Sequence, residues 1–155
     1  GCPVIYYGSE LGMNGGKDPG NRAPMRWELL SDENEDLASI RHFNAMREKC
    51  PALRVGDFRI LDSSQLLAFL RITADPRETI LFAANPTNAA IFDLIPIRDS
   101  LLMDAEKLYC LHSSETVTLQ SGWLEIELQP GEFRIFRAVN KSGKSGYSAF
   151  KRTLL

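Results

Sequence analysis

The sequence predicts a mainly β protein: an antiparallel β-sandwich that follows one strand–loop–helix unit of a larger α/β structure. Three observations predict it. From about residue 53 onward, short apolar segments alternate with turn signals, which is typical of antiparallel sandwiches. Before residue 51, a non-alternating apolar run is followed by a long loop and then by an apolar stripe at helical spacing. At 155 residues, the chain is also shorter than the ~250 residues that a complete (β/α)8 barrel needs.

The first expected element is the run Pro3-Val4-Ile5-Tyr6-Tyr7, which ends at Gly8. The run does not alternate between apolar and polar residues, so it predicts a parallel strand that is covered on both faces. Residues 8–31 then form a long loop rich in Gly, Pro, Asn and Asp. A loop of this length without elements of its own is uncommon in a compact domain, and it is usually either functional or disordered.

A helix is predicted after this loop. Asp32, with Glu35 three residues later, resembles a capping box, and Ser31 is a competing cap. Pro51 is expected to end the helix, because proline cannot continue it. Apolar residues recur between these limits at helical spacing and predict one buried stripe: Leu37, Ile40, Phe43 and Met46.

Three segments are predicted along the chain. A lone parallel strand needs a neighbouring strand and cover on both faces, so residues 1–52 are expected to be the last βα unit of a larger α/β structure whose other units are missing, such as an incomplete (β/α)8 barrel. Residues 140–155 are basic and begin with a Ser/Gly-rich stretch, so they are expected to form a mobile tail. Residues 53–139 are expected to form the sandwich, with strands at 58–61, 66–72, 79–84, 89–95, 107–111, 116–119, 123–128 and 133–139.

Composition and charge narrow the classes of function. A net charge of −2 argues against a nucleic-acid binder, and no apolar run approaches the ~20 residues of a membrane span. The three cysteines, Cys2, Cys50 and Cys110, are odd in number and far apart, so neither a disulfide framework nor a zinc site is expected. His42 and His112 lack a second ligand at metal spacing. We therefore expect no metal, no cofactor, no nucleic acid and no membrane as partner.

Particular residues resemble those of a known family. Residues 1–13 (GCPVIYYGSELGM) resemble the last barrel strand of the alpha-amylase family, glycoside hydrolase family 13, and residues 15–27 (GGKDPGNRAPMRW) resemble the loop after it. Residues 47–56 look like the end of the last barrel helix, and residues 133–137 like the closing strand of the family's C-terminal Greek-key sandwich. The resemblance covers about residues 1–139. The form of the loop is closest to the cyclomaltodextrinase, neopullulanase and maltogenic amylase group.

The resemblance implies an enzyme that cleaves α-glucosidic bonds with retention of configuration. In the family, a nucleophilic carboxylate and an acid/base carboxylate lie ~5–5.5 Å apart, and a third carboxylate stabilises the transition state. All three lie on earlier barrel strands, so none maps onto this sequence and no catalytic residue is assigned. We expect a parent enzyme that acts on α-glucans (starch, maltooligosaccharides, cyclodextrins or pullulan), and an inactive 155-residue chain.

The family's substrate-binding residues, unlike its catalytic carboxylates, have counterparts in this sequence. The family's Asp and Arg in this loop line the donor-side sugar subsites, and they correspond to Asp18 and Arg22. A carboxylate accepts hydrogen bonds from sugar hydroxyls, and a guanidinium donates several in a fixed geometry. Their i, i+4 spacing equally suits an ion pair with a purely structural role, and this alternative stays open. Glu10 is interpreted as a structural acid at the strand end, and Trp27 as packed beneath the loop rather than stacked on a sugar.

Two other functions stay open. The sandwich alone would serve as a non-catalytic carbohydrate-binding module, although its strands predict no cluster of exposed aromatic residues and Trp123 is their only tryptophan. Alternatively, the sandwich supports the missing barrel or joins subunits into a homo-oligomer through an exposed apolar seam. The missing part determines three further properties, which this sequence does not predict: the preference for α-1,4 or α-1,6 bonds, hydrolysis or transglycosylation, and calcium dependence.

Overall fold

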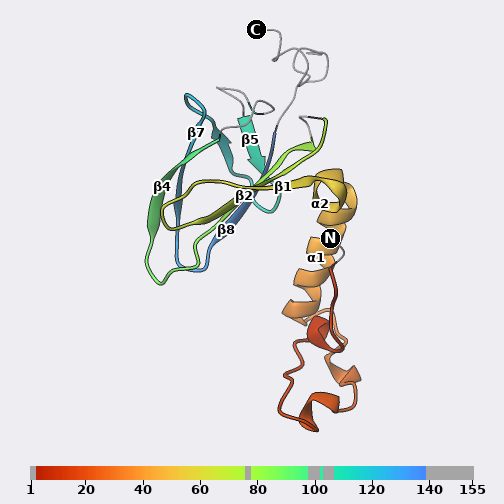
Figure 1. The fold of residues 1–155 in the computed structure, drawn as a ribbon. Coiled ribbons are helices and arrows are strands. Elements are labelled where there is room, and N and C mark those ends of the chain that lie inside the picture. Colours follow the sequence, from red (N-terminus) through yellow and green to blue (C-terminus); the bar gives the residue numbers. More distant parts are fainter. Residues whose placement is uncertain (1–2, 76–77, 98–101, 103–106, 139–155) are drawn as a thin grey trace. The chain divides into compact units, whose positions relative to one another are not determined.

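A computed structural model describes residues 3–75, 78–97, 102 and 107–138 (Figure 1). The chain divides into two compact units, Gly1–Lys49 and Cys50–Leu155. The predicted domain limits stay a prediction, and the predicted tail at 140–155 lies outside the described residues. Within the described ranges, no helix is both long enough and apolar enough to cross a membrane.

The first unit has no strand among its described residues. Three 3-10 turns, η1 (Ser9–Leu11), η2 (Gly20–Arg22) and η3 (Trp27–Leu29), precede helix α1 (Glu35–Lys49). Residues 3–6 have no regular secondary structure, and their side chains are exposed. The predicted parallel strand is therefore absent, because an extended segment becomes a strand only when a neighbouring strand completes its ladder of hydrogen bonds.

Helix α1 is capped by Asn34. The Oδ1 atom of Asn34 accepts a hydrogen bond from the N–H of Leu37 at 3.0 Å, which satisfies one of the free donors of the first turn. The Nδ2 group of Asn34 also donates to the carbonyl oxygens of Leu11 at 3.2 Å and Leu29 at 2.9 Å. One side chain thus joins the start of the helix to two points of the preceding loop.

The predicted cap at Asp32 or Ser31 is therefore wrong. Asp32 instead forms an exposed ion pair with Arg41 at 3.2 Å. Both Asp and Asn cap helices well, but only the amide of Asn34 has donors as well as an acceptor. The two loop carbonyls that need a donor therefore favour the asparagine.

The apolar stripe of α1 is only partly covered, and the helix ends where predicted. Leu37 and Met46 are buried, whereas Phe43 is exposed. Helix α1 ends at Lys49, and Pro51 begins a second, short helix α2 (Pro51–Val55). Proline fits this first helical position because its missing N–H would have no partner there.

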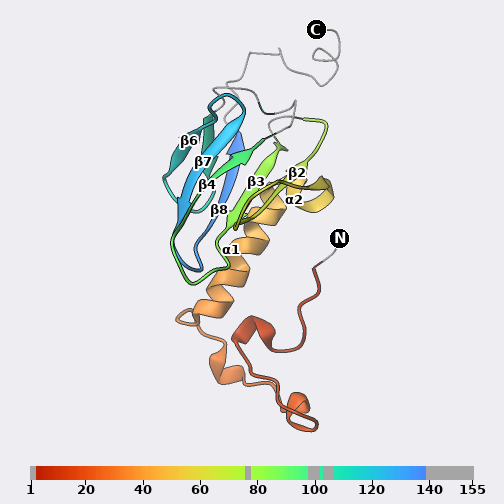
Figure 2. The ribbon, with the colours of Figure 1, turned by 60° about the vertical axis from the view of Figure 1, so that its left-hand side comes forward.

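The second unit is an antiparallel sandwich of two sheets (Figure 2). The larger sheet has the strand order β1-β2-β3-β8-β5-β6, and the smaller sheet pairs β4 with β7. The predicted fold class is confirmed, and all eight predicted strands are found with ends within two residues of the prediction. Their bounds are β1 (Asp57–Ile60), β2 (Leu67–Ile72), β3 (Ile80–Ala84), β4 (Ile91–Pro96), β5 (Lys107–Cys110), β6 (Thr116–Thr118), β7 (Trp123–Leu128) and β8 (Phe133–Ala138).

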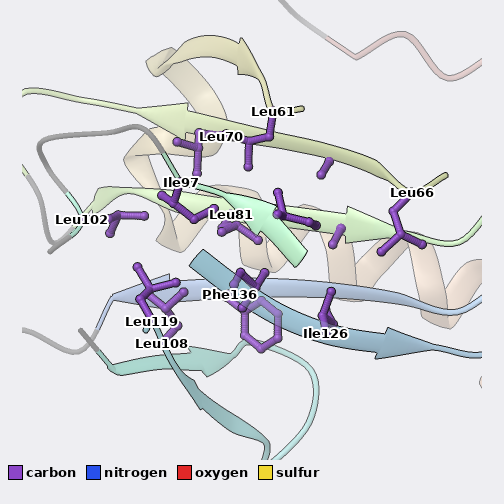
Figure 3. Packing of buried hydrophobic residues seen from close by; sticks show 14 of the residues in the cluster. Leu61, Leu66, Leu70, Leu81, Ile97, Leu102, Leu108, Leu119, Ile126 and Phe136 are labelled. Atoms are coloured by element: carbon purple, nitrogen blue, oxygen red, sulfur yellow. The ribbon is translucent and has the colours of Figure 1, made fainter. Parts of the chain in front are cut away.

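The core lies between the two sheets. Strand β7 alternates as predicted, with Glu125 and Glu127 exposed and Leu124, Ile126 and Leu128 buried. Figure 3 shows Ile126 of the smaller sheet close to Phe136 of the larger sheet within this core. Full burial of one such aliphatic side chain contributes about 1.5–3 kcal/mol. The residues from the larger sheet include Leu70, Leu81, Leu108 and Phe136.

The outer face of the larger sheet carries a ladder of aromatic rings. Phe58 of β1, Phe69 of β2, Phe82 of β3 and Phe133 of β8 follow one another, with ring centroids 4.9, 4.7 and 6.2 Å apart. Cross-strand pairs of this kind stabilise a sheet. Phe58 is exposed. Phe69, Phe82 and Phe133 are only partly exposed, so this ladder is not a cluster of fully exposed aromatic residues.

Candidate functional site

The loop that carries the predicted sugar-binding residues is anchored at its start. Gly8 and Gly12 have left-handed φ angles of 78° and 71°, which glycine adopts without strain. A Cβ atom on Gly12 would come within 2.1 Å of Asp36 Oδ2, so the Asp36 side chain would have to move to accommodate it. Between these glycines, η1 buries Leu11, whose carbonyl accepts the hydrogen bond from Asn34. The rest of the loop extends from this anchored start.

Asp18 and Arg22 come together on this loop. Arg22 Nε lies 3.4 Å from Asp18 Oδ1, and the two side chains are 76% and 64% exposed. The ion pair that the i, i+4 spacing suggested is therefore formed. Because exposed ion pairs contribute little to stability, this pair is a weak structural device. Its solvent-facing donors and acceptors are available to a ligand.

A shallow pocket lies beside this pair within the first unit. Gly20 and Asn21, which stand between Asp18 and Arg22 in the chain, line it together with Tyr6, Tyr7 and Asn14. The Tyr7 hydroxyl also donates a hydrogen bond to the Ala23 carbonyl at 3.3 Å. Aromatic faces beside amide groups suit a ligand with apolar and hydroxylated faces.

The pocket shows what sequence reasoning missed. Asp18 and Arg22 do not line it, whereas Tyr6 and Tyr7, interpreted as strand residues, do. The sequence feature that could have pointed to this pocket is the position of two tyrosines directly before the loop. Tyr6 and Tyr7 do not lie in a strand, and both line the pocket instead.

Glu10 and Trp27, the two other loop residues considered in the sequence, differ in burial. Glu10 lies half-buried in η1. Trp27 is 69% exposed, so the expectation that it packs beneath the loop is wrong. The physical reason is the lack of apolar cover: only Leu11, Leu37 and Met46 are buried hydrophobic residues among the described part of this unit.

In the part of the chain that the structure describes, neither the thiols nor the potential metal ligands form a second site. Cys50 and Cys110 are free and buried, and burial raises the pKa of Cys50, which makes its thiol a poor nucleophile. Cys110 Sγ lies 3.4 Å from His112 Nδ1, and Cys2 lies outside the described residues. Among the residues that the structure describes, no group of three or more His, Cys, Asp or Glu is arranged to hold a metal ion.

Comparisons with known proteins bear on this loop and sandwich. No family model matches the chain. A cyclomaltodextrinase from a Bacillus species is 37% identical over 92 residues, which cover 57% of this chain and 16% of that protein. The intracellular maltogenic amylase of Bacillus subtilis strain 168 is 30% identical over 151 residues, which cover 90% of this chain and 23% of the relative. Among solved structures, an Anoxybacillus alpha-amylase has a TM-score of 0.73 at 27% identity, covering 91% of this chain and 30% of its own.

The resemblance of this chain to the alpha-amylase family is therefore confirmed. This chain spans less than a third of the length of each of these relatives. The match to the Anoxybacillus alpha-amylase covers 91% of this chain.

Proposed function

We propose that this chain is the C-terminal piece of a retaining glycoside hydrolase that acts on α-glucans, and that it lacks the catalytic carboxylates. The cyclomaltodextrinase and maltogenic amylase relatives support the substrate class. They are enzymes by name, which favours a glycosidase over a free-standing binding module. The observation that carries the proposal at this site is the exposed pair of Asp18 and Arg22 beside the loop pocket.

We further propose that Asp18 and Arg22 contact sugar hydroxyls. The carboxylate of Asp18 accepts hydrogen bonds only, and the guanidinium of Arg22 donates them only, so together they match a ring that offers both. The two charged groups lie side by side, with Arg22 Nε 3.4 Å from Asp18 Oδ1, so one sugar ring can reach both. Tyr6 and Tyr7 supply aromatic surface beside them.

An activity assay tests the first proposal. The purified 155-residue chain is incubated with maltooligosaccharides, cyclodextrin and pullulan, and released reducing ends are measured. We expect no turnover, because a retaining mechanism needs a nucleophile and an acid/base in one site. Turnover that is retained through further purification steps would show that catalytic groups lie in this chain.

A binding titration tests the role of Asp18 and Arg22. In the variant Trp123→Phe, Trp27 is the one remaining tryptophan, and its fluorescence reports on the loop during titration with maltoheptaose. We expect Asp18→Asn and Arg22→Gln each to weaken binding about tenfold, the effect of one charged hydrogen bond. The matched control is Asp32→Asn, which breaks another exposed Asp–Arg pair in the same unit. Equal affinities in all these variants would contradict the assignment.

A further inference from the structure

The outer face of the two-stranded sheet carries a continuous row of exposed side chains. The register of β4 and β7 places Pro96 opposite Trp123, Leu94 opposite Glu125, and Phe92 opposite Glu127. Because side chains alternate along a strand, these six lie on one face. Phe92, Leu94 and Trp123 are 58%, 50% and 44% exposed.

The chemistry of this face differs between its two strands. Strand β4 contributes the apolar side chains, and β7 contributes an indole followed by two carboxylates. Neither Glu125 nor Glu127 forms an ion pair or a hydrogen bond with any residue that the structure describes. The carboxylates therefore keep all their acceptor positions for a ligand, beside an aromatic ring that the sandwich leaves in solvent.

We propose that this face binds an α-glucan chain, as a second contact surface separate from the loop with Asp18. We call it the β4–β7 strip, defined by Phe92, Leu94, Pro96, Trp123, Glu125 and Glu127. The inference rests on the proposed function, because it takes its ligand class from there.

The chemistry of a glucan matches that of the strip. A sugar ring has an apolar C–H face that stacks on an indole, and hydroxyls that donate to carboxylates. The strip has no basic side chain, so an anionic ligand would meet two like charges. Residues 92–96 extend for about 13 Å at the rise of a strand, which is longer than one sugar ring and so favours an oligosaccharide.

A single-tryptophan titration tests the strip. Trp27→Phe leaves Trp123 as the one tryptophan of the chain, and maltoheptaose is added while its fluorescence is followed. We expect a saturable change. The double substitution Glu125→Gln with Glu127→Gln in this background should weaken binding about tenfold. Asp57→Asn, an exposed acid on the other sheet, is the matched control and should leave the affinity unchanged.

The same design separates the strip from the loop. A response of Trp123 that survives Asp18→Asn supports the strip, even if the Trp27 reporter shows no binding at the loop. A response of Trp27 without one of Trp123 overturns the strip and leaves the proposed function intact. If Trp123 responds to a lysine-rich peptide but not to maltoheptaose, the strip is a protein-binding surface and the inference is wrong. Circular dichroism verifies that each variant keeps its sheet content.

Discussion

Asn85 is a fully buried polar residue that joins the two sheets. It follows β3, and its Nδ2 group donates to the carbonyl oxygens of Ala89 at 2.7 Å and Leu128 at 2.9 Å. Its Oδ1 atom accepts hydrogen bonds from the N–H and the hydroxyl of Thr87 at 2.9 and 2.7 Å. Because Leu128 belongs to β7, this one amide ties the larger sheet to the smaller one and also shapes the turn between β3 and β4.

We predict that Asn85→Ala lowers the free energy of unfolding by about 3 kcal/mol, because it leaves the buried Leu128 carbonyl without its donor. Urea denaturation followed by circular dichroism measures this change. Asn88→Ala, at an exposed position of the same turn, is the control and should change stability by less than ~0.5 kcal/mol. Equal effects of the two substitutions would argue against the inter-sheet role.

Asp93 makes a second link between the sheets. It lies on β4, and its Oδ2 atom accepts hydrogen bonds from the Ser63 hydroxyl at 2.6 Å and the Ser64 N–H at 3.0 Å. Burial raises the pKa of Asp93, but these bonds and the one from the Leu94 N–H outweigh it, so the pKa lies below its ordinary value. The ionised carboxylate is therefore the form that stabilises the fold.

This lowered pKa fixes the direction of a pH effect. A carboxyl whose pKa falls on folding contributes stability above its unfolded pKa of about 3.9, and loses it as the pH falls through the lower folded pKa. We predict that Asp93→Asn costs about 1–3 kcal/mol at pH 7, and that the difference from the unsubstituted chain shrinks below about pH 4. Urea denaturation from pH 7 to pH 3 measures it. A difference that stays constant over this range would contradict the role of the charge.

Sequence patterns did not reveal either link, for a physical reason. Asn85 belongs to an Asn-Pro-Thr-Asn turn signal, and Asp93 is one acid within a predicted strand. Both assignments are correct locally. The role of each side chain depends on a partner far along the chain, 43 residues from Asn85 and about 30 from Asp93. Local propensity carries no information on such pairs.

At the scale of the element, helix α1 depends on the cap that sequence reasoning misplaced. We predict that Asn34→Ala increases the hydrogen-exchange rate of the Leu37 amide, because Asn34 Oδ1 is its acceptor. Loss of such a cap typically costs a helix ~1 kcal/mol, or about a fivefold change in protection. Asp32→Ala removes the predicted cap and should leave this amide unchanged. Exchange measured by NMR distinguishes the two, and slower exchange in Asn34→Ala than in Asp32→Ala would refute the assignment.

Strands could be predicted where residues within the strand and its adjoining turns determine its limits. Strand β7 alternates between acidic and apolar residues, and Gly122 and Gly131 mark the turns on either side of it, so its limits follow from the sequence alone. The run at residues 3–7 carries an equally strong pattern, but its strand would need a neighbour that the described residues do not contain. Asp18 and Arg22 were found through the family resemblance, because no periodicity singles them out.

At the scale of the whole molecule, the two units differ in how much core they contain. One continuous cluster of buried side chains joins both sheets of the second unit. The first unit has few buried hydrophobic residues in its described part, and Tyr6, Tyr7 and Trp27 are exposed. Hydrophobic burial is the main favourable term of folding, so the sandwich should be the more stable unit. The site proposed on the loop therefore belongs to the less stable part.

We predict that the two units unfold separately in urea. The tryptophans report one unit each: Trp27 remains in Trp123→Phe, and Trp123 remains in Trp27→Phe. The Trp27 transition should have its midpoint about 1 M or more below that of Trp123, since regions with few buried contacts open at lower free energy. The loss of β-sheet circular dichroism should coincide with the Trp123 transition in both variants. A common midpoint for the two fluorescence transitions would show that the units unfold as one cooperative structure, and that the first unit draws its stability from the second.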